Sequence, residues 1–176
     1  EFMGLHLPGA SFINPGTDMR KAMTVMGVEQ LLRITALGNA FRPVYNILDE
    51  KAFVNGIVGL MATGGSTNLV LHLPAMAQAA GIVLTLQDFS DIASITPLLV
   101  KVYPNGLADV NHFHAAGGLG YLIAELLDAG LLHEDVTTVL GEGLRAYTQE
   151  PKLTPDGVRF VDGPKKSLND KILRNA

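Results

Sequence analysis

The chain has 176 residues, of which 48% are hydrophobic and only 17% are charged, and its mean hydropathy is +0.27. This length is sufficient for one domain with a sizeable core, and the apolar surplus predicts extensive buried surface, part of it against another domain or subunit. The net charge of −4 argues against nucleic-acid binding. No apolar run is long enough to span a membrane. The lack of cysteine excludes a disulfide framework and a cysteine-ligated cluster held by this chain alone. The start of the chain shows no signal peptide, so we expect a cytoplasmic protein.

The first half of the chain is predicted to consist of helices. Its apolar residues recur at helical spacing, and Ser, Thr, Asp, Pro and Gly stand where helices begin and end. The run Val54–Ala62 is apolar nearly all round, which predicts a buried helix. The other helices are expected from Thr17 or Asp18 to Leu37 with an interruption at Gly27, from Pro43, and from Ser66 to Gly81.

The second half is predicted to mix helices with a few short strands. Its clearest amphipathic pattern is a helix that carries Leu119, Leu122, Ile123 and Leu126 on one face and is closed by Gly130. Further helices are expected at Ser90–Leu99 and at Val136–Tyr147, the second broken in its middle by Gly141 and Gly143. Strands are expected at Ile82–Leu86, at Val100–Tyr103 and on both sides of the turn Pro155–Gly157.

Together these elements predict an α/β fold in which helices dominate, with several buried helices and a few short strands. Residues 1–150 are expected to form the helix-rich part of the chain. Residues 151–176 are expected to be a polar extended segment that becomes a linker from Gly163 onward.

The most informative motif contains two glycines followed by Ser, Thr and Asn, at Gly64, Gly65, Ser66, Thr67 and Asn68. The glycines let the backbone approach a ligand closely, and Ser66 can cap the next helix, whose N-terminus would favour an anion. The side chains of Ser66, Thr67 and Asn68 add neutral groups suited to a carboxylate or to sugar hydroxyls. The same spacing is also typical of a turn and helix cap with nothing bound, and it lacks the lysine of a phosphate-binding P-loop.

The histidines admit two interpretations each. In an extended segment, His112 and His114 would share one face and could bind a metal or a phosphate, whereas in a helix they would diverge and form a polar helix entry. His72 lies one turn after Asn68, so both could face one site, and the alternative is a hydrogen-bonded histidine in the core.

Several stretches together resemble the family of dihydroxy-acid and 6-phosphogluconate dehydratases. The family pattern appears in Ala62–Asn68, which is followed by Leu71–Leu73 and Ala75–Ala77. The stretches that point to the sugar-phosphate branch are Leu7–Phe12, Tyr103–Gly106 leading to Asn111–Phe113, and Gly130–Val136. The resemblance covers nearly the whole chain and weakens after about residue 151.

The resemblance implies a segment of a hydro-lyase that converts 6-phospho-D-gluconate into 2-dehydro-3-deoxy-6-phosphogluconate in the Entner–Doudoroff pathway. It implies a [4Fe–4S] cluster that acts as a Lewis acid on the leaving C3 hydroxyl, a base that removes the C2 proton, and a divalent metal as a further cofactor. It also implies a homodimer and a place for this chain inside a larger N-terminal catalytic domain, which is followed by a C-terminal domain.

The family's cluster cysteines and metal motif would precede Glu1, and its catalytic base would follow Ala176. We therefore expect no catalytic residue and no metal ligand in this chain, and no activity from the chain alone. The resemblance favours Gly64 to Asn68 as residues that line the substrate or cluster pocket, with a supporting role in packing as the alternative. His112 is a further candidate for contact with the substrate phosphate. Two alternatives stay open: a dihydroxy-acid or aldonic-acid dehydratase, and a noncatalytic docking or assembly module.

Overall fold

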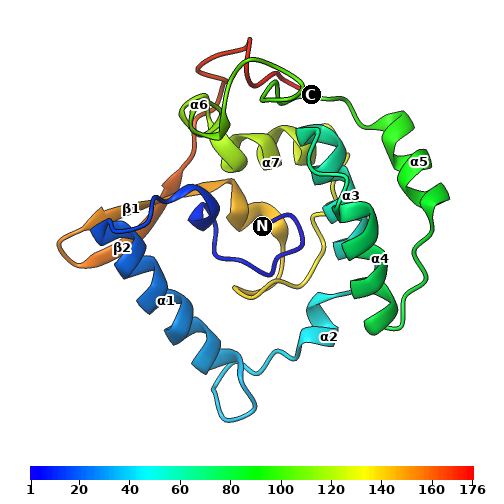
Figure 1. The fold of residues 1–176 in the computed structure, drawn as a ribbon. Helices are drawn as coiled ribbons and strands as arrows, with labels where there is room; N and C mark the ends of the chain where they lie inside the picture. The colour runs from blue at the N-terminus through cyan, green and yellow to red at the C-terminus, as the bar shows by residue number, and fades with distance from the viewer.

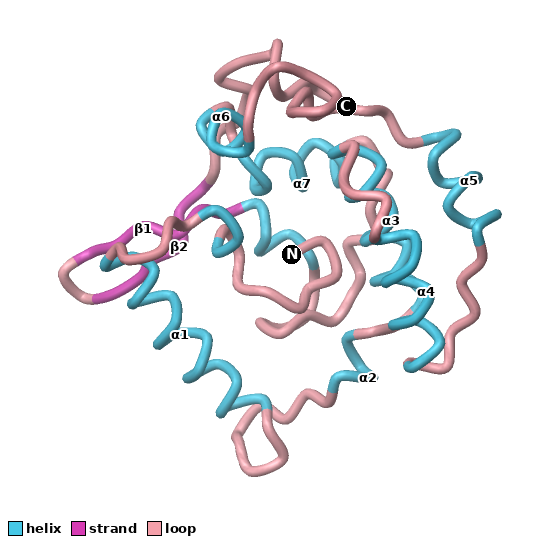
Figure 2. Tube along the Cα trace, in the orientation of Figure 1, coloured by secondary structure: helices cyan, strands magenta, loops and turns pink.

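The computed structural model describes residues 1–176, and helices dominate it (Figure 1, Figure 2). The elements are η1 (Ala10–Phe12), α1 (Asp18–Ile34), α2 (Val44–Ile47), α3 (Glu50–Thr63), α4 (Leu69–Ala79), α5 (Leu86–Ile95), α6 (Val110–Ala115), α7 (Gly118–Asp128), η2 (Leu144–Thr148), β1 (Gln149–Thr154) and β2 (Gly157–Asp162). The predicted helix-dominated α/β class is therefore confirmed. None of the helices combines the length and the apolar character that a membrane crossing requires.

The largest hydrophobic core surrounds α7. This helix buries Leu122, Ile123 and Leu126 completely, and η2 adds Leu144 and Tyr147. A β-carbon on Gly120 would lie 3.2 Å from the carbonyl oxygen of Thr148, so the glycine allows the backbones of α7 and η2 to approach closely. Full burial of each large apolar side chain contributes about 1.5–3 kcal/mol, which makes α7 the main anchor of the fold.

Helix α3 joins this core to a second one. Val58 and Ala62 face the core around α7, while Phe53, Ile57 and Leu60 pack against α4 and α5 in the second core. A helix that is covered on two sides needs apolar residues nearly all round, which explains the composition of Val54–Ala62 and confirms the predicted buried helix.

The N-terminal segment crosses the middle of the molecule and lies against α3 (Figure 1). Two glycines of α3 make this approach possible. A β-carbon on Gly59 would overlap the ring of Phe2, and one on Gly56 would lie only 3.0 Å from the side chain of Met3. The glycines therefore accommodate the N-terminal segment.

Strands β1 and β2 form an antiparallel hairpin in which Gln149 pairs with Asp162 and Thr154 with Gly157. The predicted extended segments around the turn at residues 155–157 are confirmed. The end of the chain packs on the core: Leu173 is buried, and the backbone of residues 172–174 bonds to residues 99–101. The expected linker toward a further domain stays a prediction.

Several expected elements are wrong or shifted. Residues 82–84 are not a strand, because Thr85 forms a reciprocal capping box with Asp88 that starts α5 four residues before the expected Ser90. Residues 136–143 are not helical: Gly141 and Gly143 have φ of 152° and 89°, and the segment forms a bridged turn before η2. The expected interruption of α1 at Gly27 is absent.

Residues 100–103 do not form a strand of a sheet either. Val100 and Val102 make only isolated bridges, to Leu173 and Ala108. The segment is nevertheless held across the end of α3, because the N–H groups of residues 99 and 100 both donate to the carbonyl oxygen of Ala62.

Candidate functional site

The glycine pair forms the turn that ends α3. Gly64 adopts the left-handed conformation with φ 58°, and the N–H groups of Gly64 and Gly65 bond back to carbonyl oxygens of the last turn of α3. A β-carbon on Gly64 would overlap the side-chain amide of Asn105. Both the conformation and the space at this position therefore require glycine.

The residues after the glycines are exposed and carry free hydrogen-bonding groups. Helix α4 begins at Leu69 rather than at Ser66, and its first N–H groups are bonded to the carbonyl oxygens of Ser66 and Thr67. The Ser66 hydroxyl accepts from the N–H of Asn68 at 3.3 Å. The N–H groups of Ser66 and Thr67 have no partner in the chain. The expected anion site at a helix N-terminus is thus replaced by a turn that offers two N–H groups and two hydroxyls.

This turn lines a cavity of about 890 Å³, a volume typical of small-molecule sites. Four parts of the chain contribute to it: the N-terminal segment, the end of α3 with the glycine turn, the segment after residue 99, and the start of α6 and α7. The lining residues are Phe2, Ser11, Phe12, Gly56, Gly59, Leu60, Thr63, Gly64, Gly65, Ser66, Thr67, Leu69, Val100, Val102, Tyr103, Pro104, Asn105, Val110, Phe113 and Leu119.

The cavity combines apolar walls with neutral polar groups. The rings of Phe12 and Phe113 pack edge to face with their centroids 5.4 Å apart. The polar lining side chains are hydroxyls and one amide, from Ser11, Thr63, Ser66, Thr67, Tyr103 and Asn105. No lining residue is charged. Such a surface can donate to and accept from the hydroxyls of a polyol, but it supplies no cation for a phosphate or carboxylate.

Asn105 belongs to the site, and the sequence reasoning gave it no role. Its side-chain amide donates to the carbonyl oxygen of Gly64 at 3.0 Å, so it ties the loop after Tyr103 to the glycine turn. The stretch Tyr103–Gly106 was part of the family resemblance, but contact with Gly64 depends on a separation of 41 residues that no local pattern reveals.

The predicted residues Asn68 and His112 do not line the cavity. His112 lies in α6, where its Nδ1 accepts from the N–H of Asp109 at 3.3 Å and the Asp109 carboxylate accepts from the N–H of His112 at 3.0 Å. The N–H of His112 is the main cause that holds the pKa of Asp109 below its ordinary value. The helical interpretation of His112 and His114 is therefore the correct one.

No other histidine arrangement supports metal binding. His72 is exposed on α4, so its interpretation as a core residue is wrong. No group of three or more His, Cys, Asp or Glu side chains lies close enough together to hold a metal ion.

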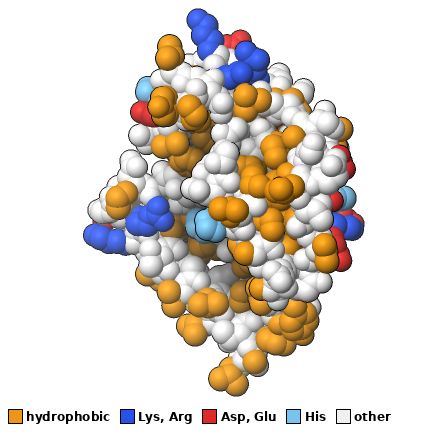
Figure 3. Space-filling model, turned by 45° about the vertical axis from the view of Figure 1, so that its right-hand side comes forward, with side chains coloured by type: hydrophobic (Ala, Val, Ile, Leu, Met, Phe, Trp, Pro, Cys, Tyr) orange, Lys and Arg blue, Asp and Glu red, His pale blue; other side chains and the backbone are white.

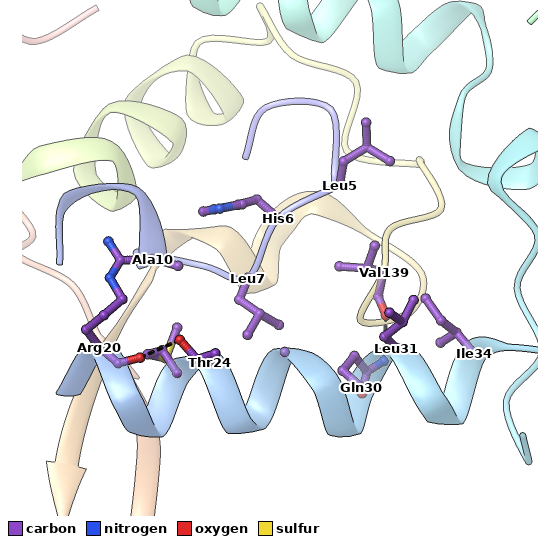
Figure 4. Close-up of a pocket in the computed structure, with 12 residues that line it drawn as sticks. Leu5, His6, Leu7, Ala10, Arg20, Thr24, Gln30, Leu31, Ile34 and Val139 are labelled. Carbon is purple, nitrogen blue, oxygen red and sulfur yellow. Dashed lines mark hydrogen bonds between the residues drawn. The ribbon is translucent and has the colours of Figure 1, made fainter. Parts of the chain in front are cut away.

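A second cavity of about 350 Å³ lies between the N-terminal segment and α1 (Figure 4). Leu7 points toward the middle of α1, and Leu31 and Val139 lie at the end of the cavity near Ile34. Three of its polar side chains are already bonded: Arg20 donates to the carbonyl oxygen of Ile13, the Thr24 hydroxyl to that of Arg20, and the Gln30 amide to that of Val139 at 2.5 Å. This cavity therefore offers fewer free polar groups than the first, which is also more than twice as large.

Residues 1–147 match the sequence profile described as Dihydroxy-acid/6-phosphogluconate dehydratase N-terminal. The chain belongs to the dihydroxy-acid/6-phosphogluconate dehydratase family. Among its relatives are the phosphogluconate dehydratases of Rhizobium meliloti (strain 1021), 60% identical over 174 residues, and of Escherichia coli (strain K12), 51% identical over 173 residues. The dihydroxy-acid dehydratase of Prochlorococcus marinus (strain NATL2A) is 38% identical over 168 residues.

These family members are much longer than the region they share with this chain. The alignments cover 98% of the chain for the first two relatives and 93% for the third. The chain spans only 29% of the length of the phosphogluconate dehydratases and 30% of the dihydroxy-acid dehydratase. The resemblance inferred from the glycine motif and the neighbouring stretches is therefore confirmed at the level of the family.

Proposed function

We propose that this chain is part of a hydro-lyase that dehydrates 6-phospho-D-gluconate to 2-dehydro-3-deoxy-6-phosphogluconate, the dehydration of the Entner–Doudoroff pathway. The observation that carries the proposal is the identity of 51–60% to proteins named phosphogluconate dehydratase, over nearly the whole chain. The dihydroxy-acid dehydratase is less similar at 38%, which makes that activity the second candidate.

Within this enzyme, the turn from Gly64 to Thr67 contacts the hydroxylated carbon chain of the substrate. Its free N–H groups and the hydroxyls of Ser66 and Thr67 are neutral, exposed and placed in the large cavity. They match the repeated hydroxyls of a sugar acid better than they match its charged ends. Asn68 and His112 do not line the cavity, so an effect of either residue on substrate binding would act through the neighbouring residues that do.

The chemical step requires groups that this cavity does not provide. Hydroxide is a poor leaving group and the proton next to a carboxylate is weakly acidic, so the elimination needs an acid or Lewis acid and a base. The lining contains no titratable side chain except Tyr103. The chain therefore binds and orients substrate, and by itself catalyses no dehydration.

The residues of this chain do not fit an iron–sulfur cluster. Such clusters are held mainly by cysteine thiolates, and the chain has no cysteine and no cluster of other metal-binding side chains. The [4Fe–4S] cluster and the divalent metal proposed for the whole enzyme would have ligands elsewhere.

The whole enzyme is proposed to be a cytoplasmic homodimer, and the surface of the chain is compatible with further contacts. Large apolar side chains on α1, on the following loop and on α2 are more than half exposed: Val25, Val28, Leu31, Leu32, Leu37, Phe41, Val44 and Tyr45. Hydrophobic side chains also gather at the lower end of the face shown in Figure 3. Apolar patches of this kind favour contact with other protein surfaces, which keeps an assembly role as the candidate of a different class.

A substrate comparison tests the proposal. The intact enzyme that contains this chain would be assayed with 6-phospho-D-gluconate, with D-gluconate and with a branched 2,3-dihydroxy acid, and the 2-keto acid product would be measured. We expect the highest kcat/KM with the phosphorylated acid. A preference for the branched acid would support the second candidate instead, and no turnover of any of the three would favour the assembly role.

A further inference from the structure

Ser11 is a lining residue of the large cavity to which no role has been assigned. It lies in η1, more than 50 residues before the glycine turn, and its side chain is exposed. Its hydroxyl is held by a carboxylate. The Ser11 Oγ lies 2.5 Å from Oε1 of Glu1, and the Ser11 N–H donates to the same oxygen at 3.1 Å.

The Glu1 carboxylate is fixed from several sides. Its side chain is 0% exposed, and its other oxygen, Oε2, accepts from the N–H of Gly9 at 2.7 Å. The Nδ1 atom of His6 lies 3.7 Å from Oε1. Burial works against ionisation, but the contact with His6, the hydrogen bonds from Ser11 and Gly9 and the charge of the neighbouring amino group hold the pKa of the Glu1 carboxyl below its ordinary value. The carboxylate is therefore ionised at neutral pH.

An ionised carboxylate can only accept hydrogen bonds, so the proton of the Ser11 hydroxyl is committed to Glu1. What Ser11 offers to the cavity is the remaining lone-pair capacity of its oxygen. That oxygen is an acceptor and not a donor. It is complementary to a ligand hydroxyl, which carries a proton, and not to the oxygens of an ionised carboxylate or phosphate, which carry none.

We propose that Ser11 is a substrate-binding residue that accepts a hydrogen bond from a hydroxyl of the polyhydroxy acid, with Glu1 as the positioning residue that fixes its orientation. This inference rests on the proposed function of the cavity and adds to it the part of the substrate that is bound there. The buried negative charge of Glu1 beside the wall further disfavours either charged end of the substrate at this position.

Kinetics of the intact enzyme test the proposal. Ser11→Ala removes the acceptor, and we expect KM for 6-phospho-D-gluconate to rise about tenfold with kcat within about twofold, because a contact made equally in the ground and transition states changes KM alone. Ser11→Thr keeps a hydroxyl and should restore KM to within about threefold of the original enzyme. Ser94→Ala removes an exposed hydroxyl on α5 that is bonded to the carbonyl of Asp91, and it serves as the matched control.

The positioning role of Glu1 has its own readout. In Glu1→Gln the side-chain amide can donate a hydrogen bond to the Ser11 hydroxyl. The hydroxyl is then no longer restricted to accepting a hydrogen bond from the ligand, so we expect a smaller rise in KM than in Ser11→Ala. The double variant should be no worse than Ser11→Ala alone, because Glu1 acts through Ser11. Additive losses in the double variant would contradict the positioning role.

Binding measurements separate this inference from the proposed function. Calorimetric titration of D-gluconate into the original enzyme and into Ser11→Ala should show weaker binding to the variant, even if the enzyme dehydrates a different acid. An unchanged KM and unchanged D-gluconate affinity in Ser11→Ala would overturn the role of Ser11. So would an equal loss in Ser11→Thr with unaltered thermal stability. Lack of dehydration of 6-phospho-D-gluconate by the original enzyme would instead overturn the proposed function.

Discussion

The side-chain amide of Asn105 donates a hydrogen bond to the carbonyl oxygen of Gly64, with 3.0 Å between the two atoms. This bond joins the glycine turn at the end of α3 to a loop that lies 41 residues further along the chain. The two segments form adjoining parts of the cavity wall. The shape of the cavity therefore depends on a contact that neither segment can make by itself.

Asn105→Ala should release this loop. We expect faster hydrogen exchange of the amides of residues 103–109, and a loss of about 1 kcal/mol or less in the free energy of unfolding, because the bond is exposed. Asn105→Asp should behave similarly, since a carboxylate cannot donate. Asn39→Ala, which alters an exposed side chain with no hydrogen bond, is the control. Unchanged exchange in both Asn105 variants would show that the bond does not hold the loop.

Two glycine-to-alanine substitutions in helices should have opposite effects. Gly59→Ala places a methyl group where the Phe2 ring lies, so we expect lower stability and a displaced N-terminal segment. Gly27→Ala meets only Leu7 at 3.7 Å, an ordinary contact, and should stabilise α1 by about 0.5–1 kcal/mol through helix propensity. Urea unfolding monitored by circular dichroism would measure both. Stabilisation by Gly59→Ala would contradict the packing of Phe2 on α3.

Asn55 should be essential for stability. Its buried side chain donates to the carbonyl oxygen of His133 at 2.9 Å and accepts from the N–H of the same residue at 2.8 Å. Asn55→Ala leaves both backbone groups without a partner and opens a small void, so we expect a loss of about 2–4 kcal/mol. The midpoint of thermal unfolding would show it. A loss below about 0.5 kcal/mol would mean that water replaces the side chain without cost.

The stability of the protein should fall in acid partly through Glu1. Because the pKa of this carboxyl is lowered on folding, the unfolded chain binds more protons below about pH 4.3, so stability rises with pH in that range. The contribution is present above this range and is lost as the pH falls through the folded-state pKa. Glu1→Gln should reduce the slope of stability against pH between about pH 3 and 5. Glu29→Gln, at an exposed carboxylate of α1, is the control, and equal slopes in the two variants would contradict the account.

Local patterns predicted the elements that are controlled by burial and by turn chemistry. Short stretches of sequence are sufficient for these elements. Examples are the periodic apolar residues of α7, the all-round apolar run in α3 and the turn after Thr154. The prediction of a strand at residues 82–86 was wrong because the capping box of Thr85 and Asp88 outweighs a short β-branched run. The helix predicted at Val136–Tyr147 was wrong over residues 136–143, because Gly141 and Gly143 adopt positive φ and end regular structure there instead of only interrupting a helix.

The candidate site was predictable only in part. The glycine turn is a continuous motif, and its place beside the cavity could be anticipated from the residue types. Ser11 and Asn105 reach the same cavity from distant segments, so their contribution depends on tertiary packing. His112 was assigned to the site on chemical grounds, but its side chain completes a helix cap instead.

The central claim is that the turn from Gly64 to Thr67 contacts the hydroxylated part of the substrate. Steady-state kinetics of Thr67→Val in the intact enzyme test it most directly, because valine keeps the shape of threonine and replaces only the hydroxyl, by a methyl group. The matched control is Thr35→Val, at an exposed threonine that ends α1. We predict that KM for 6-phospho-D-gluconate rises about fivefold or more in Thr67→Val and stays within about twofold in the control. Equal KM values in the two variants, with stability unchanged, would contradict the claim.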